Sequence, residues 1–181
     1  MASLERTLEG GIMAGMAAAA AMALFSMLAT AADLGLYGRL YLVTAIVEPG
    51  PLEVSMAEAE GGLGTFLEVG GAAAGLAVHL GIGAGFGAVF ALGARVLRLR
   101  GPLAVAAGAL YGLAVMALMG LVVLPAAAGQ TVGGQLIADA PELLGWPVFA
   151  AEHLVYGLGL GVWTAVATRD RGAVVPGQAA S

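Results

Sequence analysis

Residues 69–94 read VGGAAAGLAVHLGIGAGFGAVFALGA, which is 26 residues in a row without a formal charge between Glu68 and Arg95. A helix needs about 20 apolar residues to cross a bilayer, and a helix satisfies its own backbone there. The stretch therefore predicts a membrane-spanning helix. Its one ionisable side chain is His79.

The charges elsewhere mark the ends of three further expected spans. Between Glu9 and Asp33 lie 23 uncharged residues, enough for one helix. After Arg100, a helix should end near residue 124, because Pro125 and a polar run at 129–135 follow. The last apolar segment holds only Glu152 and His153 as ionisable groups. We expect one domain over 1–171, with spans at about 10–32, 69–96, 102–124 and 147–168, and a disordered tail at 172–181.

Composition narrows the function. Of the 181 residues, 60% are hydrophobic and 10% charged, which indicates an integral membrane protein. The seven basic residues are all arginine, so no lysine can serve a P-loop or a Schiff base, and there is no cysteine. The net charge of −5 argues against nucleic acid as a partner. Ser26 has no convincing triad partners, and we expect no enzyme.

The arginines predict the orientation of the chain. Six of the seven fall before the first span, between the second and third, or after the fourth, and only Arg39 falls on the opposite side. Because positively charged loops stay in the cytoplasm, both termini are expected inside, in a bacterial cytoplasmic membrane. The loop at 34–68 is then an acidic outer loop, which should attract cations. We expect it to contain some structure, including a short helix at VSMAEAE, residues 54–60.

Two segments indicate an internal duplication. Residues 79–87 read HLGIGAGFG and residues 153–161 read HLVYGLGLG, so the histidine, the leucine and three glycines match. The first and third spans also correspond, through MALFSML at 22–28 and MALMGLV at 116–122. The expected fold is an all-α, up-down bundle of four helices built from two parallel helical-hairpin repeats.

Depth and spacing place two histidines and two methionines in one layer. Each lies 16 residues from an arginine at the inner ends of the spans, about 24 Å at 1.5 Å per residue. Each also belongs to a row of small residues at four-residue spacing, the type of face that helices turn toward one another in lipid. We therefore expect all four to point inward; they are His79, His153, Met22 and Met116.

This layer is a candidate cofactor site. If the second and fourth helices lie on a diagonal, His79 and His153 face each other and could be axial ligands of haem b or of a chlorophyll-type pigment. Gly83 and Gly157, one turn below, would leave room for a flat ring. Alternatively, His79, His153, Met22 and Met116 could bind copper, which accepts imidazole and thioether ligands. For a haem, donors near the propionates would be Arg39, Trp146 and Tyr156.

Two other interpretations stay open. Intramembrane histidines often only form hydrogen bonds between helices, and methionines in alanine-rich spans often only fill space. The second interpretation is a proton or ion path, because Glu152 is next to His153 in the sequence and intramembrane ionisable residues often mark relays. Below the layer, however, the helices carry no further acid or base to continue such a path.

The two HLxxGxGxG segments, the stretch GALYGLAVMAL at 108–118 and the expected topology resemble the YagU-like proteins and related families of unknown function. These are small four-helix bacterial inner-membrane proteins. The resemblance covers the four spans, about 100 residues, and is clearest around His79 and His153. It implies fold and location, and it brings no activity or cofactor.

The expected function is non-enzymatic. We predict an accessory subunit of a larger membrane complex, redox or photosynthetic in character, that contacts the lipid bilayer and other membrane subunits or further copies of itself. The alternative is a small transporter or a metal- or proton-handling membrane protein.

Overall fold

The computed structural model describes residues 2–62 and 64–173, and every regular element within these ranges is a helix. Four are long: α1 (Ala2–Ala29), α5 (Val69–Val96), α6 (Gly101–Leu118) and α10 (Trp146–Ala173). Three stretches of the described chain are long and apolar enough to cross a membrane: Leu4–Ala29, Val69–Val96 and Gly101–Ala128. Helix α10 is equally long but less apolar, so its crossing stays a prediction.

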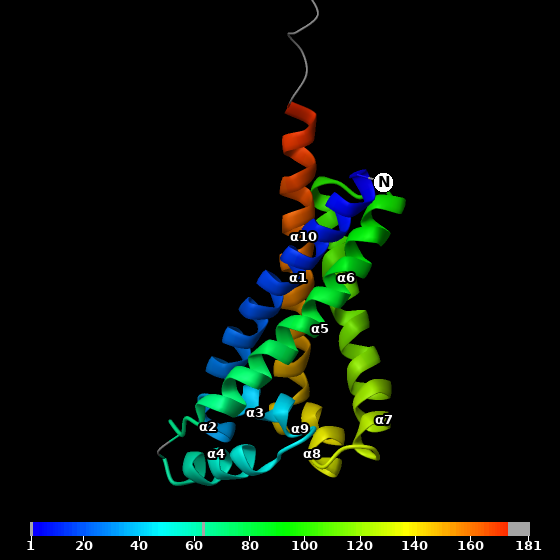
Figure 1. Cartoon of the computed structure of the whole chain (residues 1–181). Coiled ribbons are helices and arrows are strands. Elements are labelled where there is room, and N and C mark those ends of the chain that lie inside the picture. The colour runs from blue at the N-terminus through cyan, green and yellow to red at the C-terminus, as the bar shows by residue number, and fades with distance from the viewer. Residues whose placement is uncertain (1, 63, 174–181) are drawn as a thin grey trace, which may run out of the picture.

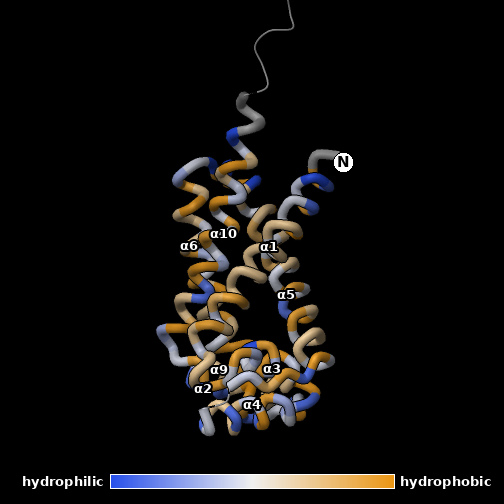
Figure 2. Tube along the Cα trace, turned by 90° about the vertical axis from the view of Figure 1, so that its left-hand side faces the viewer, coloured by the Kyte–Doolittle hydropathy of each residue, from blue (hydrophilic) through white to orange (hydrophobic). Residues whose placement is uncertain are grey.

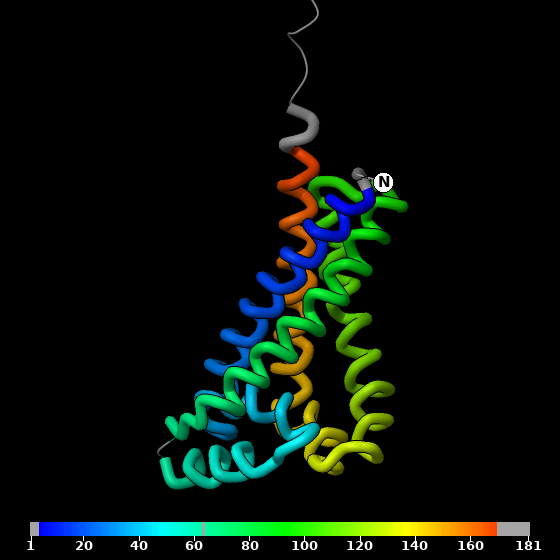
Figure 3. The backbone as a smooth tube through the Cα atoms, viewed as in Figure 1, coloured from blue at the N-terminus to red at the C-terminus, as the bar shows by residue number. Residues whose placement is uncertain are grey.

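The long helices associate as two pairs. Helix α1 packs along α5, helix α6 packs along α10, and the pairs meet mainly through α1 and α10. In Figure 3 the traces of α1 and α5 run side by side along nearly the same diagonal. Helix α5 has few contacts with either α6 or α10. Helices α1 and α5 thus form one closely packed pair and α6 and α10 another, with α5 only loosely packed against the second pair.

Glycine and alanine occupy the faces between paired helices, and larger side chains face outward. On α6, Ala104 is fully buried, whereas Leu110 is 69% exposed. This distribution is the reverse of a soluble helix and is typical of helices in lipid, where small residues allow close backbone approach. In Figure 2 the hydrophilic colours gather mainly near the two ends of the long helices.

The third span does not end at Pro125. Helix α6 continues through the π-helical turn Met119–Val123 into α7 (Leu124–Ala128), so the helical segment exceeds the expected 102–124. Proline removes a backbone donor and its ring crowds the preceding turn. A π turn changes the hydrogen-bond spacing directly before it and accommodates both effects without ending the helix.

Five short helices cover one end of the long ones (Figure 1), which we call the cap end. They are α2 (Ala31–Leu34), α3 (Gly38–Thr44), α4 (Gly50–Glu60), α8 (Gly134–Ala138) and α9 (Ala140–Leu144). Helix α4 contains the VSMAEAE segment that was expected to be helical. Helix α3 packs directly against α5.

Helix α3 is held to the start of α5 by one buried tyrosine. Tyr41 is completely buried, and its hydroxyl accepts a hydrogen bond of 2.7 Å from the Glu68 amide. The Glu68 side chain in turn accepts from the amides of Gly70 and Gly71, which caps α5. The expected outer loop therefore contains at least one helix, α3, that is fixed to the start of α5.

The opposite end carries the arginines of the α5–α6 turn and Arg6 of α1, and we call it the arginine end. Helix α10 runs on to Ala173, so residues 172 and 173 are helical and do not belong to a disordered tail. The rest of the expected tail, 174–181, lies outside the described residues.

Candidate functional site

A buried ion pair joins the cap to the long helices. Arg39 of α3 donates from Nε to Oε2 of Glu152 at 3.2 Å and from Nη2 to Oε1 at 3.1 Å. Glu152 has no exposed surface, and Arg39 is 8% exposed. A bidentate, doubly charged contact of this type is strong and fixes the relative orientation of its two planes. The Arg39–Glu152 ion pair therefore fixes α3 to α10.

Glu152 lies about 9 Å along α10 from its first residue, Trp146, at 1.5 Å per residue. Within an apolar helix a carboxylate at such a position is costly unless a partner neutralises it. Arg39 supplies that partner because Gly35, with a φ of +78°, turns the chain after α2 so that α3 runs back beneath the long helices.

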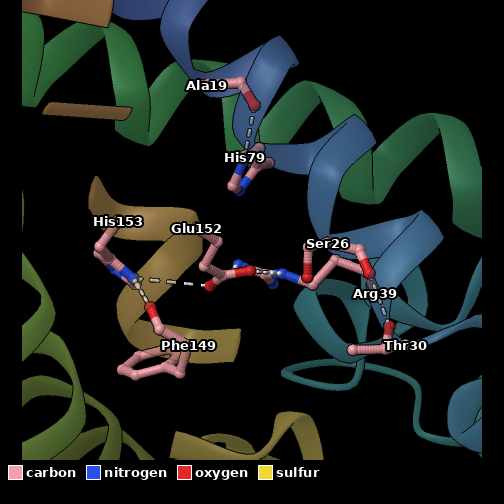
Figure 4. A network of polar contacts seen from close by, with 8 residues as sticks. All are labelled: Ala19, Ser26, Thr30, Arg39, His79, Phe149, Glu152 and His153. Carbon is pink, nitrogen blue, oxygen red and sulfur yellow. Dashed lines mark hydrogen bonds and ion pairs between the residues drawn. The ribbon is translucent and has the colours of Figure 1, made fainter. Parts of the chain in front are cut away.

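His153 lies next to the ion pair. Its Nδ1 is 2.8 Å from the Phe149 carbonyl oxygen on the same helix and 3.6 Å from Oε1 of Glu152. Figure 4 shows the Glu152 carboxylate between His153 and Arg39. In a neutral ring, Nδ1 then carries the proton donated to Phe149, and Nε2 is left as an acceptor or ligand atom.

His79 reaches the same region from α5. Its Nε2 is 3.1 Å from the Ala19 carbonyl oxygen on α1, so in the neutral ring Nε2 is the donor and Nδ1 has a free lone pair. His79 thus bonds across a helix pair, whereas His153 bonds within its own helix. The matched HLxxGxGxG segments therefore place their histidines in different local environments.

Both histidines line one cavity of about 130 Å³, which we call the cap cavity. Most of its wall is apolar, and Arg39 and the Tyr156 hydroxyl are its other polar groups. Tyr156 donates a 2.7 Å hydrogen bond to the Gly83 carbonyl oxygen, and both residues line the cavity. The structure therefore brings ionisable groups from α3, α5 and α10 around one small space.

The remaining predicted site residues divide into two groups. Met22 and Gly83 line the cap cavity. Gly157 is buried between α6 and α10, and Met116 packs into the cap-end core; neither is among the residues that line the cavity. Met119, one turn from Met116, lines it instead.

The cavity size bears on the predicted cofactors. At about 130 Å³ it is far smaller than the roughly 300 to 1,000 Å³ pockets that hold drug-sized ligands. A cavity of about 150 Å³ accepts a molecule the size of benzene. The space between His79 and His153 therefore suits a few waters, an ion or a small molecule, and a porphyrin ring does not fit it.

One buried hydroxyl lacks a partner. Within the described residues, Ser26 Oγ of α1 is fully buried and forms no hydrogen bond. Figure 4 shows Ser26 on α1 in the same region as the Arg39–Glu152 pair. A buried polar atom without a partner is unusual and marks a place where a water or an ion could bind.

The Arg39–Glu152 pair is not among the contacts predicted from the sequence. Arg39 was assigned to an outer loop, as a donor for a haem propionate. The usable signal was that each residue is an isolated charge in an apolar stretch, and isolated opposite charges at the same end of a membrane protein tend to pair. The resemblance to YagU-like proteins stays a prediction, because no family model, curated protein or solved structure matches this chain.

Proposed function

We propose that this chain is a non-enzymatic, multi-pass membrane protein that handles protons at the Arg39–Glu152–His153 cluster, as a small transporter. In this proposal α10 is the fourth span of a four-helix bundle in a bacterial cytoplasmic membrane. Both termini lie inside and the cap lies outside, as the arginine distribution predicts. The observation that carries the proposal is a fully buried Glu152 between a guanidinium and an imidazole.

The chemistry follows from the charge balance of the cluster. While Glu152 is ionised, it neutralises Arg39 and holds α3 over the cavity. A proton arriving at Glu152 removes this pairing and leaves the Arg39 guanidinium unpaired in an apolar site, which is strongly unfavourable. Moving α3 outward returns Arg39 to water and opens the cap cavity, so protonation and opening are coupled.

His153 is the proton partner of Glu152 in this scheme. Its Nδ1 lies 3.6 Å from Oε1, and the Phe149 carbonyl oxygen holds the ring in place. A small rotation of either side chain would bring the two atoms to hydrogen-bond distance. Intramembrane carboxylate and imidazole groups of this kind are the usual components of proton relays.

The test measures proton flux into sealed vesicles. Purified protein is reconstituted into vesicles that enclose a pH-sensitive dye, and a potassium diffusion potential drives proton entry. We expect faster acidification than in protein-free vesicles, and a loss of at least about tenfold in Glu152→Gln, because the relay depends on this carboxylate. Unchanged flux in Glu152→Gln would refute the proposal.

The matched control is Glu53→Gln. Glu53 is an exposed carboxylate on α4 at the same end of the molecule and makes no part of the cluster. The Glu53→Gln variant should leave the proton flux unchanged. Circular dichroism of both variants verifies that they are folded.

A second candidate function is that of an accessory subunit, and one surface of α5 favours it. Gly81, Gly85 and Gly93 are exposed, and a Cβ added to any of them would meet nothing within 4 Å. Because the chain has no cysteine, Gly85→Cys can be cross-linked in native membranes, with Val122→Cys as an exposed control on the other pair. Cross-linking at Gly85 alone would support a subunit interface. Metal analysis and absorption spectra of the same preparation test for copper or a pigment.

A further inference from the structure

A second, larger cavity lies at the arginine end, between α1, α5 and α10. Its volume is about 410 Å³, and four arginines line it: Arg6, Arg95, Arg98 and Arg100. We call it the arginine cavity. Among the described residues that line it, none is an aspartate or glutamate. The nearby acids of α1, Glu5 and Glu9, are exposed and are not part of its wall.

The deeper wall of this cavity is apolar. Phe90 and Leu160 are buried at its base, and Trp163 lies on its rim, 45% exposed. A cavity with guanidinium groups at the mouth and hydrocarbon deeper in the bundle matches a ligand with an anionic head and an apolar tail. A purely hydrophilic anion would contact only the guanidinium groups at the mouth and would leave the apolar wall uncovered.

The backbone holds one of these arginines in an unusual conformation. Arg98 has a φ of +53°, the only positive φ at a residue other than glycine in the described chain. The Leu99 amide donates to the Ala94 carbonyl oxygen and the Arg98 amide to that of Arg95, which forms a Schellman motif at the end of α5. Glycine is the usual residue at this position. An arginine here carries a strained backbone that a glycine would relieve, and its side chain lines the cavity.

We propose that the arginine cavity binds a phosphate-bearing anion. Guanidinium groups recognise phosphate through paired, charge-assisted hydrogen bonds. Basic pockets between membrane helices on the cytoplasmic side are suited to the headgroups of anionic lipids. Two sources share this chemistry: the headgroup of an anionic phospholipid and free phosphate. The proposal is independent of proton handling at the cap end.

The test uses Trp163 as a reporter in the cavity. A Trp146→Phe variant leaves Trp163 as the chain's single tryptophan. The protein is reconstituted in phosphatidylcholine vesicles that contain 20 mol% of brominated phosphatidylglycerol or, for comparison, 20 mol% of brominated phosphatidylcholine. Bromine quenches tryptophan on contact, so stronger quenching by the anionic lipid measures its enrichment at the cavity.

Arg98→Gly is the decisive variant because it removes the guanidinium and relieves the strained backbone. If the unfolding measurement shows this variant to be at least as stable as the wild type, lost binding cannot be attributed to a weakened fold. We expect the enrichment of phosphatidylglycerol to fall by about fivefold, the effect of one arginine near an anionic surface. Arg169→Gln is the matched control: Arg169 is exposed on α10 and does not line the cavity.

A second arm identifies the source of the phosphate. Inorganic phosphate is added at constant ionic strength, with chloride as the reference salt. If phosphate does not relieve the quenching, the site takes a lipid headgroup; if phosphate relieves it and chloride does not, the site also takes the free anion. The proposal would be overturned by equal losses in Arg98→Gly and Arg169→Gln, or by equal quenching by the two brominated lipids together with a Trp163 fluorescence that phosphate changes no more than chloride does.

Discussion

Replacing Gly157 by alanine should separate the α6–α10 pair. A Cβ on Gly157 would lie 2.9 Å from both the Cα and the amide nitrogen of Gly112, and closer still to the Gly108 carbonyl oxygen, whereas ordinary contact begins at 3.4 Å. All three obstacles are backbone atoms, which no side-chain rotation can move. The helices must therefore shift apart by at least 0.5 Å, the difference between 3.4 and 2.9 Å.

The magnitude follows from the cost of overpacking. Forcing an extra methyl group into a closely packed contact costs about 1 to 3 kcal/mol. Gly81→Ala provides the reference, because Gly81 is exposed on α5 and its added Cβ meets nothing. That variant should gain up to about 1 kcal/mol in helix propensity. Gly157→Ala gains the same helix propensity, so that term cancels, and we expect Gly157→Ala to be less stable than Gly81→Ala by roughly 1 to 3 kcal/mol in free energy of unfolding.

The assay is reversible unfolding in mixed micelles with increasing sodium dodecyl sulfate, followed by far-ultraviolet circular dichroism. The same comparison can be repeated with Gly83→Ala, whose Cβ would meet the Gly15 carbonyl oxygen at 3.0 Å and the Ala19 methyl group closer still. Equal stability of Gly157→Ala and Gly81→Ala would refute the inference that backbone contact at these glycines holds the pairs together.

Three further predictions concern the cap and the arginine end. Glu152→Ala should destabilise the fold by about 3 to 5 kcal/mol, because it leaves the buried Arg39 charge without a partner. The double variant Arg39→Met/Glu152→Met should lie within about 1 kcal/mol of the wild type. The same unfolding assay compares the two, and equal losses of stability would argue against a mutual charge pair. Arg98→Gly should raise stability by about 1 to 2 kcal/mol by removing the positive φ of a side-chain-bearing residue, and a decrease would show that the Arg98 side chain contributes more than its backbone costs. Tyr41→Phe should cost about 1 to 3 kcal/mol, because the Glu68 amide loses its 2.7 Å acceptor, and amide hydrogen exchange should show faster exchange at residues 66–71; unchanged protection there would exclude Tyr41 as the tie between α3 and α5.

Much of the helical architecture follows from local features of the sequence. The charge-free runs around Ala18, His79 and Gly112 predict helices, because a helix satisfies its own backbone hydrogen bonds where the bilayer offers no water to do so. The structure has long helices at all of these positions, and three stretches are apolar enough to cross a bilayer. The helix at VSMAEAE is likewise predicted from residues close together in the sequence. At Pro125 the prediction was wrong, because a π turn upstream absorbs the proline.

The candidate site depended on the tertiary structure in a different way. Sequence spacing selected His79, His153 and Met22, and all three line the cap cavity. It selected Met116, but Val115 and Met119 line the cavity, because the inward face of a helix with 3.6 residues per turn drifts away from a strict row at four-residue spacing. It also could not indicate how large the space between the histidines would be.

The sequence by itself determined which segments are helical, which faces are small enough to pack closely and where isolated charges fall, since these depend on neighbours within a turn or two of helix. Only the tertiary structure decided that Arg39 folds inward to meet Glu152, that α5 stays loosely packed against the second pair, and that four arginines surround one cavity. The physical reason is that in a chain so rich in glycine and alanine many helix faces are equally able to pack. A few long-range contacts, a buried ion pair and a tyrosine hydroxyl among them, then select one arrangement.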